Sequence, residues 1–240
     1  MTEVVESPLA YAADGQGYVG LLLKPGGGTS SAAVALLPDW RGQSALARDH
    51  ARHLVALGCM VVIVDLYGDG FNPDSPDQVG PMVQRLIAHR DRGVAALASC
   101  VEALRQQAGA RTPVFCLGYS AGGMVALDYG RSGADVAGII VCSALLKTAE
   151  PGKPTRIEAP VLALQGTQDV VSPMEMIAAV IREMDAAGND FRFELYGQTH
   201  HAFDNPEAGS DPGARLVYSA QSALWAQRAI AGFLAEHGRV

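Results

Sequence analysis

The stretch Gly118-Tyr119-Ser120-Ala121-Gly122 decides the fold of this chain. The apolar run 114–117 leads into it and the helix-forming run 124–129 follows it, which predicts a strand, a sharp turn and a helix. Gly-x-Ser-x-Gly in that setting is typical of a turn that presents a nucleophilic serine, because the glycines leave room for backbone passing close by. The turn also places Ser120 at a helix N-terminus, whose free N–H groups favour a developing negative charge. A glycine-rich turn before a buried helix is the simpler alternative, so the rest of the chain must decide.

The composition indicates one globular α/β domain, residues 1–240. Hydrophobic residues make up 49% of the chain and charged residues 18%, which suits a single large core. The formal net charge of −7 excludes the basic surface that nucleic acids and anionic membranes require, and no apolar run is long enough to span a bilayer. Residues 1–6 lack the basic and apolar regions of a signal peptide, so we expect a cytoplasmic protein.

Cysteine and histidine spacing gives no sign of a metal site. The four cysteines show no C-x-x-C spacing and fall in apolar runs, which predicts buried reduced thiols at Cys59, Cys100, Cys116 and Cys142. The adjacent His200 and His201 lack a third ligand at useful spacing. His50 and His53 lie three apart among charged residues, which favours a solvated helix face over a ligand pair. We expect neither a metal nor a cofactor.

Predicted strands and helices alternate along the chain, which indicates a mostly parallel sheet of about eight strands, covered by helices on both faces and joined by right-handed crossovers. The first two strands form an edge hairpin that turns at residues 14–17. The run Ser172-Pro173-Met174-Glu175 predicts a capping box at a helix start. The expected strands are 4–5, 18–23, 32–37, 60–65, 114–117, 136–142, 161–165 and 191–196, and the expected helices are 44–57, 81–108, one after Ser120, one from 172 and 214–236.

Polar residues just past the predicted strands supply a catalytic constellation, because sites in parallel sheets form at the carboxyl ends of the strands. Asp169 follows the strand 161–165, and His201 follows the strand 191–196. With Ser120 they give a nucleophile, an orienting acid and a base in the chain order Ser, Asp, His. The backbone N–H groups of Ala121 and Trp40 are the predicted oxyanion hole.

Three alternatives remain open from the residues alone. Asp169 is also well placed to cap the helix that opens near residue 172. Asp65 ends its own strand and is a rival acid, although it breaks the chain order of a triad. His200 is a rival base, and since it is adjacent to His201 only one of the two can point at Ser120.

These residues resemble the dienelactone hydrolases and their relatives in the α/β-hydrolase fold, over nearly the whole chain. The family places its base histidine directly before a small residue and Phe, which favours His201 over His200. The resemblance implies an α/β-hydrolase domain without cofactor. The segments that carry it are 65–68, 118–123, 165–169, 201–206 and 218–225.

Departures from the family pattern shape the expected substrate. The founding members use a cysteine where this chain has Ser120, which implies ordinary serine esterase chemistry. Their two carboxylate-binding arginines correspond to Asp69 and Asn205, and their glutamate after the third strand corresponds to Asp39. None of these residues binds a carboxylate as a guanidinium does, so we expect a neutral ester or lactone.

The predicted substrate pocket is lined by Asp39, Tyr67, Phe71, Tyr119 and Phe203, together with the Trp40 side chain. Core packing is an equally open interpretation for Phe71 and Tyr119. Arg41 is either a positive charge at the pocket mouth or a surface residue.

The primary hypothesis is a serine hydrolase acting on a small ester, lactone or thioester. An acyltransferase that passes the same acyl group to an alcohol or amine is the second hypothesis, and a non-catalytic small-molecule binding protein is the third. The expected partner is a small molecule, with no nucleic acid or membrane, and the protein is expected to be a monomer or homodimer. Apolar residues of the last segment are either core or a dimer face (Leu216, Val217, Leu224 and Trp225).

Overall fold

The computed structural model describes residues 3–27, 30–73 and 75–238. Its strands are β1 Val4–Ala13, β2 Gln16–Pro25, β3 Ala32–Leu37, β4 Cys59–Ile63, β5 Val114–Tyr119, β6 Gly138–Cys142, β7 Val161–Gly166 and β8 Phe191–Tyr196. Its α-helices are α1 Ala45–Ala56, α2 Val79–Ala88, α3 Arg90–Ala108, α4 Ala121–Arg131, α5 Met174–Ala186 and α6 Ala220–His237. Short 3₁₀ turns cover Pro76–Gln78 (η1) and Pro206–Ala208 (η2).

The strands form one eight-stranded sheet in the order β1-β2-β4-β3-β5-β6-β7-β8. The β1–β2 and β2–β4 pairs are antiparallel, and every other neighbouring pair is parallel. This arrangement confirms the predicted mostly parallel sheet with an edge hairpin. The carboxyl ends of β3, β5, β6, β7 and β8 therefore meet along one edge of the sheet.

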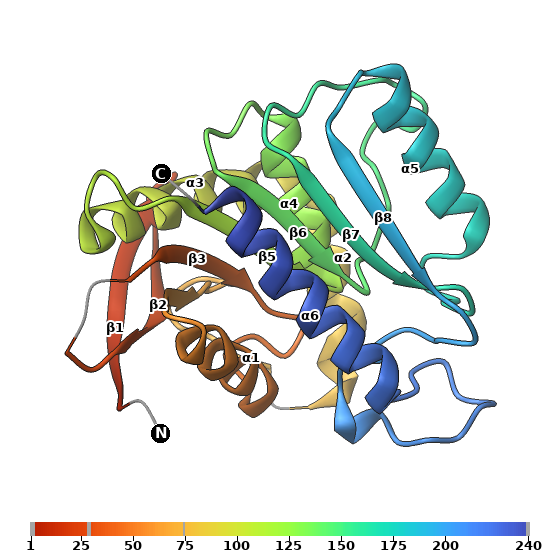
Figure 1. Ribbon diagram of the computed structural model, residues 1–240, viewed down its shortest axis with the longest axis horizontal. Helices are drawn as coiled ribbons and strands as arrows, with labels where there is room; N and C mark the ends of the chain where they lie inside the picture. Colours follow the sequence, from red (N-terminus) through yellow and green to blue (C-terminus); the bar gives the residue numbers. More distant parts are fainter. Residues whose placement is uncertain (1–2, 28–29, 74, 239–240) are drawn as a thin grey trace.

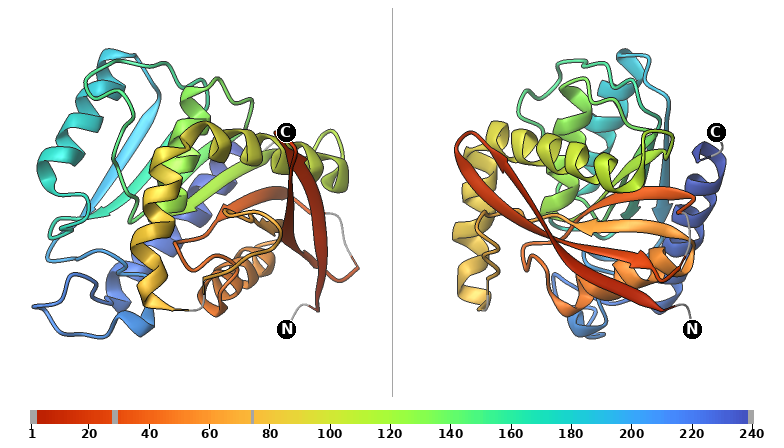
Figure 2. Two further views of the ribbon diagram at one scale, coloured as in Figure 1. Left: turned by 180° about the vertical axis from the view of Figure 1, so that it is seen from behind. Right: turned by 90° about the vertical axis from the view of Figure 1, so that its left-hand side faces the viewer.

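Helices cover both faces of the sheet, as the alternating pattern predicts. Helices α1 and α6 lie on one face (Figure 1), and α2, α3 and α4 lie on the other (Figure 2). Two clusters of buried side chains match these layers, and α5 packs with the α3–α4 layer. Because both faces are covered, every residue of β3 to β7 is buried.

The first strand is longer than predicted, Val4–Ala13 rather than 4–5, and three predictions about helices differ from the structure. The predicted helix 81–108 is two helices, because the backbone at His89 (φ −127°, ψ 52°) departs from helical geometry. The last helix begins at Ala220 rather than 214, since the Ser219 side chain caps it and the N–H of Val217 donates to the carbonyl of His201. No side-chain cap forms at α5, because the Ser172 hydroxyl donates to the carbonyl of Ala144 instead.

Two further findings concern composition. All four cysteines are buried and unpaired, and burial raises the pKa of Cys59 to about 11 and of Cys100 to about 12. Of the four apolar residues in the last segment, Val217 is buried, whereas Leu216, Leu224 and Trp225 are exposed.

Within the described ranges, no helix is both long and apolar enough to cross a membrane.

Candidate active site

Ser120 lies in the turn between β5 and α4 with a left-handed backbone conformation (φ 49°, ψ −116°). Residues that carry a side chain rarely adopt this backbone conformation, so the turn is strained. The flanking glycines are required by close approach: a Cβ on Gly118 would lie 2.6 Å from the carbonyl oxygen of Gly122, and a Cβ on Gly122 would collide with the carbonyl oxygen of Pro38. The structure thus has the strand, strained turn and helix that the sequence predicts.

Three predicted site residues come together at the edge of the sheet. His201 Nε2 lies 2.9 Å from Ser120 Oγ, and His201 Nδ1 lies 2.8 Å from Asp169 Oδ2. The Asp169 side chain has no exposed area and that of His201 is 5% exposed, so water screens this pair little. The residues follow β5, β7 and β8, which are neighbours or near neighbours in the sheet.

The two carboxylate oxygens of Asp169 have different partners. Oδ2 contacts His201, whereas Oδ1 accepts the backbone N–H groups of Val171 at 2.7 Å and Ser172 at 2.9 Å. Asp169 therefore contacts His201 with one oxygen and fixes the turn before α5 with the other. It does not cap α5, whose N-cap residue is Pro173 and which has no side-chain cap.

Asp65, the rival acid, is occupied elsewhere. Its carboxylate accepts four backbone N–H groups at 2.8–3.0 Å, from Val19, Tyr67, Gly68 and Gly70. These bonds fix the turn after β4 against the edge hairpin, which is a structural role. His200, the rival base, is partly buried, and the histidine beside Ser120 is His201.

The two backbone groups predicted for the oxyanion hole lie at the ends of neighbouring strands. Ala121 is the first residue of α4, and Trp40 lies in the loop after β3, where the Tyr67 hydroxyl donates to its carbonyl at 2.7 Å. In the part of the chain that the structure describes, neither the Trp40 N–H nor the Ala121 N–H donates to another protein group.

The residues predicted to line a substrate pocket divide into two groups. Tyr67 and Phe71 form an edge-to-face pair at 6.2 Å, with Tyr67 buried and Phe71 45% exposed. Tyr119 and Phe203 instead belong to the core under α1 and α6. The prediction is wrong for Phe203, which has no exposed area and packs against Tyr196. Tyr119 stacks on His50 at 4.2 Å and lines a cavity beside α1 and α6, so its contact with a substrate stays a prediction.

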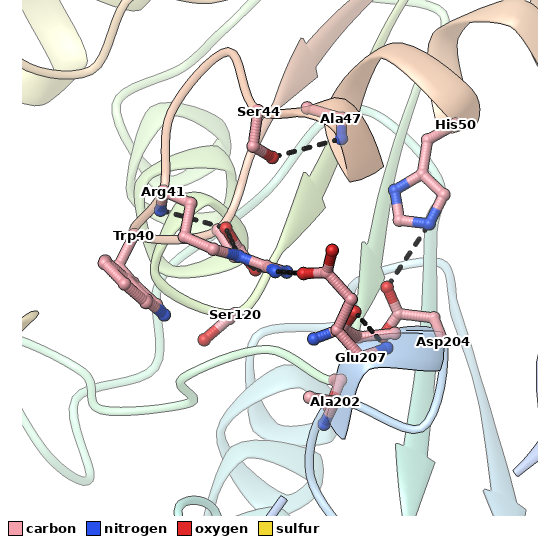
Figure 3. Close-up of polar contacts among 12 residues, drawn as sticks. Trp40, Arg41, Ser44, Ala47, His50, Ser120, Ala202, Asp204 and Glu207 are labelled. Carbon is pink, nitrogen blue, oxygen red and sulfur yellow. Dashed lines mark hydrogen bonds and ion pairs between the residues drawn. The ribbon is translucent and has the colours of Figure 1, made fainter. Parts of the chain in front are cut away.

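Arg41 is neither a free cation nor an isolated surface residue (Figure 3). Its guanidinium binds the Asp39 carboxylate at 2.7 Å and Glu207 at 2.9 Å, and its side chain is 16% exposed. Burial lowers the pKa of Arg41, but the hydrogen bonds and charge of Asp39 outweigh it, so the pKa is raised. Asp39, a predicted substrate contact, is thus engaged with Arg41.

Two groups beside the site were not identified from the sequence. His50 Nε2 lies 3.4 Å from Asp204 Oδ2 (Figure 3), which joins α1 to the loop that carries His201. Burial lowers the pKa of His50 and raises that of Asp204. The second group is Ser143, just after β6, whose Oγ lies 3.3 Å from His201 Nδ1. A histidine on an apparently solvated helix and a serine at a strand end carry no sequence signal for these contacts.

No group of three or more potential metal ligands occurs within the described ranges. The buried polar side-chain atoms of the same ranges all have hydrogen-bond partners. Within the described ranges, the Ser120 hydroxyl is paired with His201, whereas the backbone N–H groups of Trp40 and Ala121 have no protein acceptor.

The sheet order and the Ser–His–Asp contacts define the class of protein as an α/β hydrolase. The Dienelactone hydrolase family matches residues 19–238, so the chain belongs to that family, and it is a carboxylic-ester hydrolase. No curated protein matches the sequence.

Solved structures agree with this assignment. A protein named m3DLH is 28% identical, with a TM-score of 0.89 over 98% of each chain. A dienelactone hydrolase-like promiscuous phosphotriesterase from metagenomic libraries is 23% identical, with a TM-score of 0.87 over 98% of each chain. A putative dienelactone hydrolase from Klebsiella pneumoniae subsp. pneumoniae MGH 78578 is 17% identical, with a TM-score of 0.81 over 98% of this chain and 99% of the other. The last two share the fold.

Proposed function

We propose that the protein is a serine hydrolase that cleaves a small, neutral ester, lactone or thioester through an acyl-enzyme on Ser120. The observation that carries the proposal is the continuous chain of contacts from Ser120 Oγ through both ring nitrogens of His201 to Asp169 Oδ2, at 2.9 and 2.8 Å. A histidine that bridges a hydroxyl and a buried carboxylate is the arrangement that activates a serine.

In the first half of the reaction, Ser120 Oγ attacks the acyl carbon while His201 Nε2 takes its proton. Asp169 holds the Nδ1–H tautomer and stabilises the imidazolium that forms. The tetrahedral intermediate then collapses, and Nε2 returns the proton to the departing alkoxide or thiolate. In the second half, Nε2 takes a proton from water, the resulting hydroxide attacks the acyl carbon, and Ser120 leaves with the proton that Nε2 returns.

The oxyanion of each intermediate is assigned to the backbone N–H groups of Trp40 and Ala121. Both lack a protein acceptor in the described part of the chain, which supports this assignment. Ala121 also begins α4, whose dipole favours negative charge at its N-terminus. One such donor contributes about a hundredfold to a thousandfold in rate.

The charge balance beside the site supports a neutral substrate. Asp39 and Glu207 together carry two negative charges against the single positive charge of Arg41, so this cluster offers no unpaired cation to an anionic acyl group. Partly exposed Trp40 and Phe71 supply apolar surface nearby.

The test is hydrolysis of short p-nitrophenyl esters by the purified protein and its Ser120→Ala and His201→Ala variants. Both variants should fall to background, whereas His200→Ala, which changes the adjacent histidine, should retain activity. Activity that survives Ser120→Ala would overturn the proposal. Analysis of products with an added alcohol separates hydrolysis from acyl transfer, since a transferase would form the new ester in preference to the acid.

A further inference from the structure

Ser143 is a second buried hydroxyl that contacts the proposed base. It follows β6 directly, is 1% exposed, and its backbone N–H donates to the carbonyl of Leu164 at 2.9 Å. Its Oγ accepts the N–H of Ala202 at 2.8 Å and lies 3.3 Å from His201 Nδ1. One hydroxyl thus contacts both the imidazole and the peptide that follows it.

The backbone at both ends of this contact is strained. Ser143 has a φ of +48° and Ala202 a φ of +56°, values that residues other than glycine adopt only at a cost in free energy. Such conformations persist where the surroundings hold them. The bond from the Ala202 N–H to Ser143 Oγ links the two strained residues, so each helps to hold the other.

We propose that Ser143 is a positioning residue for His201, an inference that rests on the proposed function. Its hydroxyl fixes the peptide after His201 and is a second acceptor for the Nδ1–H that Asp169 binds. Asp169 Oδ2 is the closer acceptor at 2.8 Å, and Ser143 Oγ at 3.3 Å is the weaker one. Together they leave Nε2 facing Ser120.

This geometry gives Ser143 a role distinct from that of Ser120. Ser120 Oγ contacts Nε2, the nitrogen that exchanges protons with the substrate, whereas Ser143 Oγ contacts Nδ1 on the other side of the ring. With 1% exposure, Ser143 has no access to a substrate. Its contribution should grow as the ring becomes positively charged in the transition state, because Nδ1–H is then a stronger donor.

The test compares Ser143→Gly, Ser143→Ala and Ser143→Thr with the wild type. Gly and Ala both remove the hydroxyl, but Gly also relieves the positive φ, so its melting temperature should exceed that of the Ala variant. Thr keeps the hydroxyl on a β-branched side chain that resists this φ, so it should be the least stable of the three. Ser222→Ala is the matched control, because Ser222 is also buried and hydrogen-bonded but lies against Thr199 and Ser219.

Gly and Ala variants should both lose kcat by about two- to tenfold with KM unchanged, the value of one ordinary hydrogen bond. Labelling of Ser120 by a fluorophosphonate should slow by the same factor. Thr should regain most of the lost kcat despite its lower melting temperature, and Ser222→Ala should keep the wild-type kcat. The least stable variant, Thr, would then be the most active of the three, which a purely structural role cannot produce.

Wild-type kcat in the folded Gly variant would overturn the inference, as would losses in kcat that follow melting temperature across all variants. If Ser143→Thr fails to fold, the kcat values of Ser143→Gly and Ser143→Ala compared with that of Ser222→Ala still test the inference. Failure of the proposed function is distinguishable, because it is marked by activity that survives Ser120→Ala. If activity is lost in Ser120→Ala and His201→Ala but kcat is unchanged in the Ser143 variants, the inference about Ser143 is wrong and the proposed function stands.

Discussion

The Tyr67 hydroxyl donates a 2.7 Å hydrogen bond to the backbone carbonyl of Trp40. This bond ties the turn after β4 to the loop after β3, whose Trp40 N–H is assigned to the oxyanion hole. Asp65 in turn holds the backbone of Tyr67 through its carboxylate at 2.9 Å. The edge hairpin, the β4 turn and the site are therefore mechanically connected.

Tyr67→Phe tests that connection. Loss of the hydroxyl frees the Trp40 carbonyl, so kcat for a short ester should fall about two- to tenfold while KM changes little. Steady-state kinetics provides the measurement. Tyr129→Phe, a buried tyrosine on α4, is the control and should leave kcat unchanged. Equal losses in both variants would contradict a role for the Trp40 contact.

Asp169→Asn should separate the two functions of that side chain. Asn still accepts the N–H groups of Val171 and Ser172 through its carbonyl oxygen, so the turn and the fold persist. Its amide donates rather than accepts at His201 Nδ1 and favours the wrong tautomer. By analogy with other serine triads, kcat should fall by about 10³ to 10⁴ with an unchanged circular dichroism spectrum. A loss below tenfold would show that Asp169 mainly caps the turn.

Asp65→Asn should affect stability rather than chemistry. The amide nitrogen would face N–H donors that now bind a carboxylate, so the free energy of unfolding should fall by about 2–4 kcal/mol in urea denaturation. The kcat of the folded fraction should stay within a few fold of wild type. The exposed Asp185→Asn is the control and should change stability by less than about 0.5 kcal/mol. Complete inactivation of a folded Asp65 variant would restore it as the rival acid.

His50, whose side chain is 14% exposed, predicts a pH dependence of stability. Burial lowers its pKa, so between that value and its ordinary value of about 6.5 the unfolded chain binds more protons than the folded chain. The free energy of unfolding should therefore fall as the pH drops through about 6.5, and His50→Gln should flatten this slope. The pKa of Asp204 is raised, so between its ordinary value of about 3.8 and the raised value the folded chain binds more protons than the unfolded chain. In that range Asp204 makes the free energy of unfolding rise as the pH falls.

Urea denaturation between pH 5 and 8, in steps on the order of half a pH unit, provides the measurement. The control is His53→Gln, because His53 lies one turn along the same helix but is exposed. An unchanged slope in the His50 variant would contradict a lowered pKa for that side chain.

Much of the architecture was predictable because local signals and burial agree. Continuous apolar runs mark β3 to β7, which helices cover on both faces, and glycine spacing marks the turn at Ser120. Ser120, Asp169 and His201 were found from their positions after strands, since parallel strands bring those positions to one edge. Contacts that depend on side-chain direction were not predictable: Tyr119 and Phe203 are aromatic and near the site in sequence, but their rings pack in the core.

The remaining differences have similar causes. The late start of α6 comes from a tertiary contact rather than from propensity, because the Val217 N–H donates to the carbonyl of His201. Arg41 carries the same charge in either interpretation of the sequence, and only the positions of Asp39 and Glu207 reveal that it is neutralised.

The four buried cysteines have a practical consequence. Their raised pKa values leave almost no reactive thiolate at neutral pH, so alkylating reagents and mild oxidants should leave the native protein unmodified. A single cysteine introduced at an exposed position would then be the sole thiol available for a fluorescent or spin probe. The natural sequence therefore serves directly as the background for labelling experiments, without prior removal of its own cysteines.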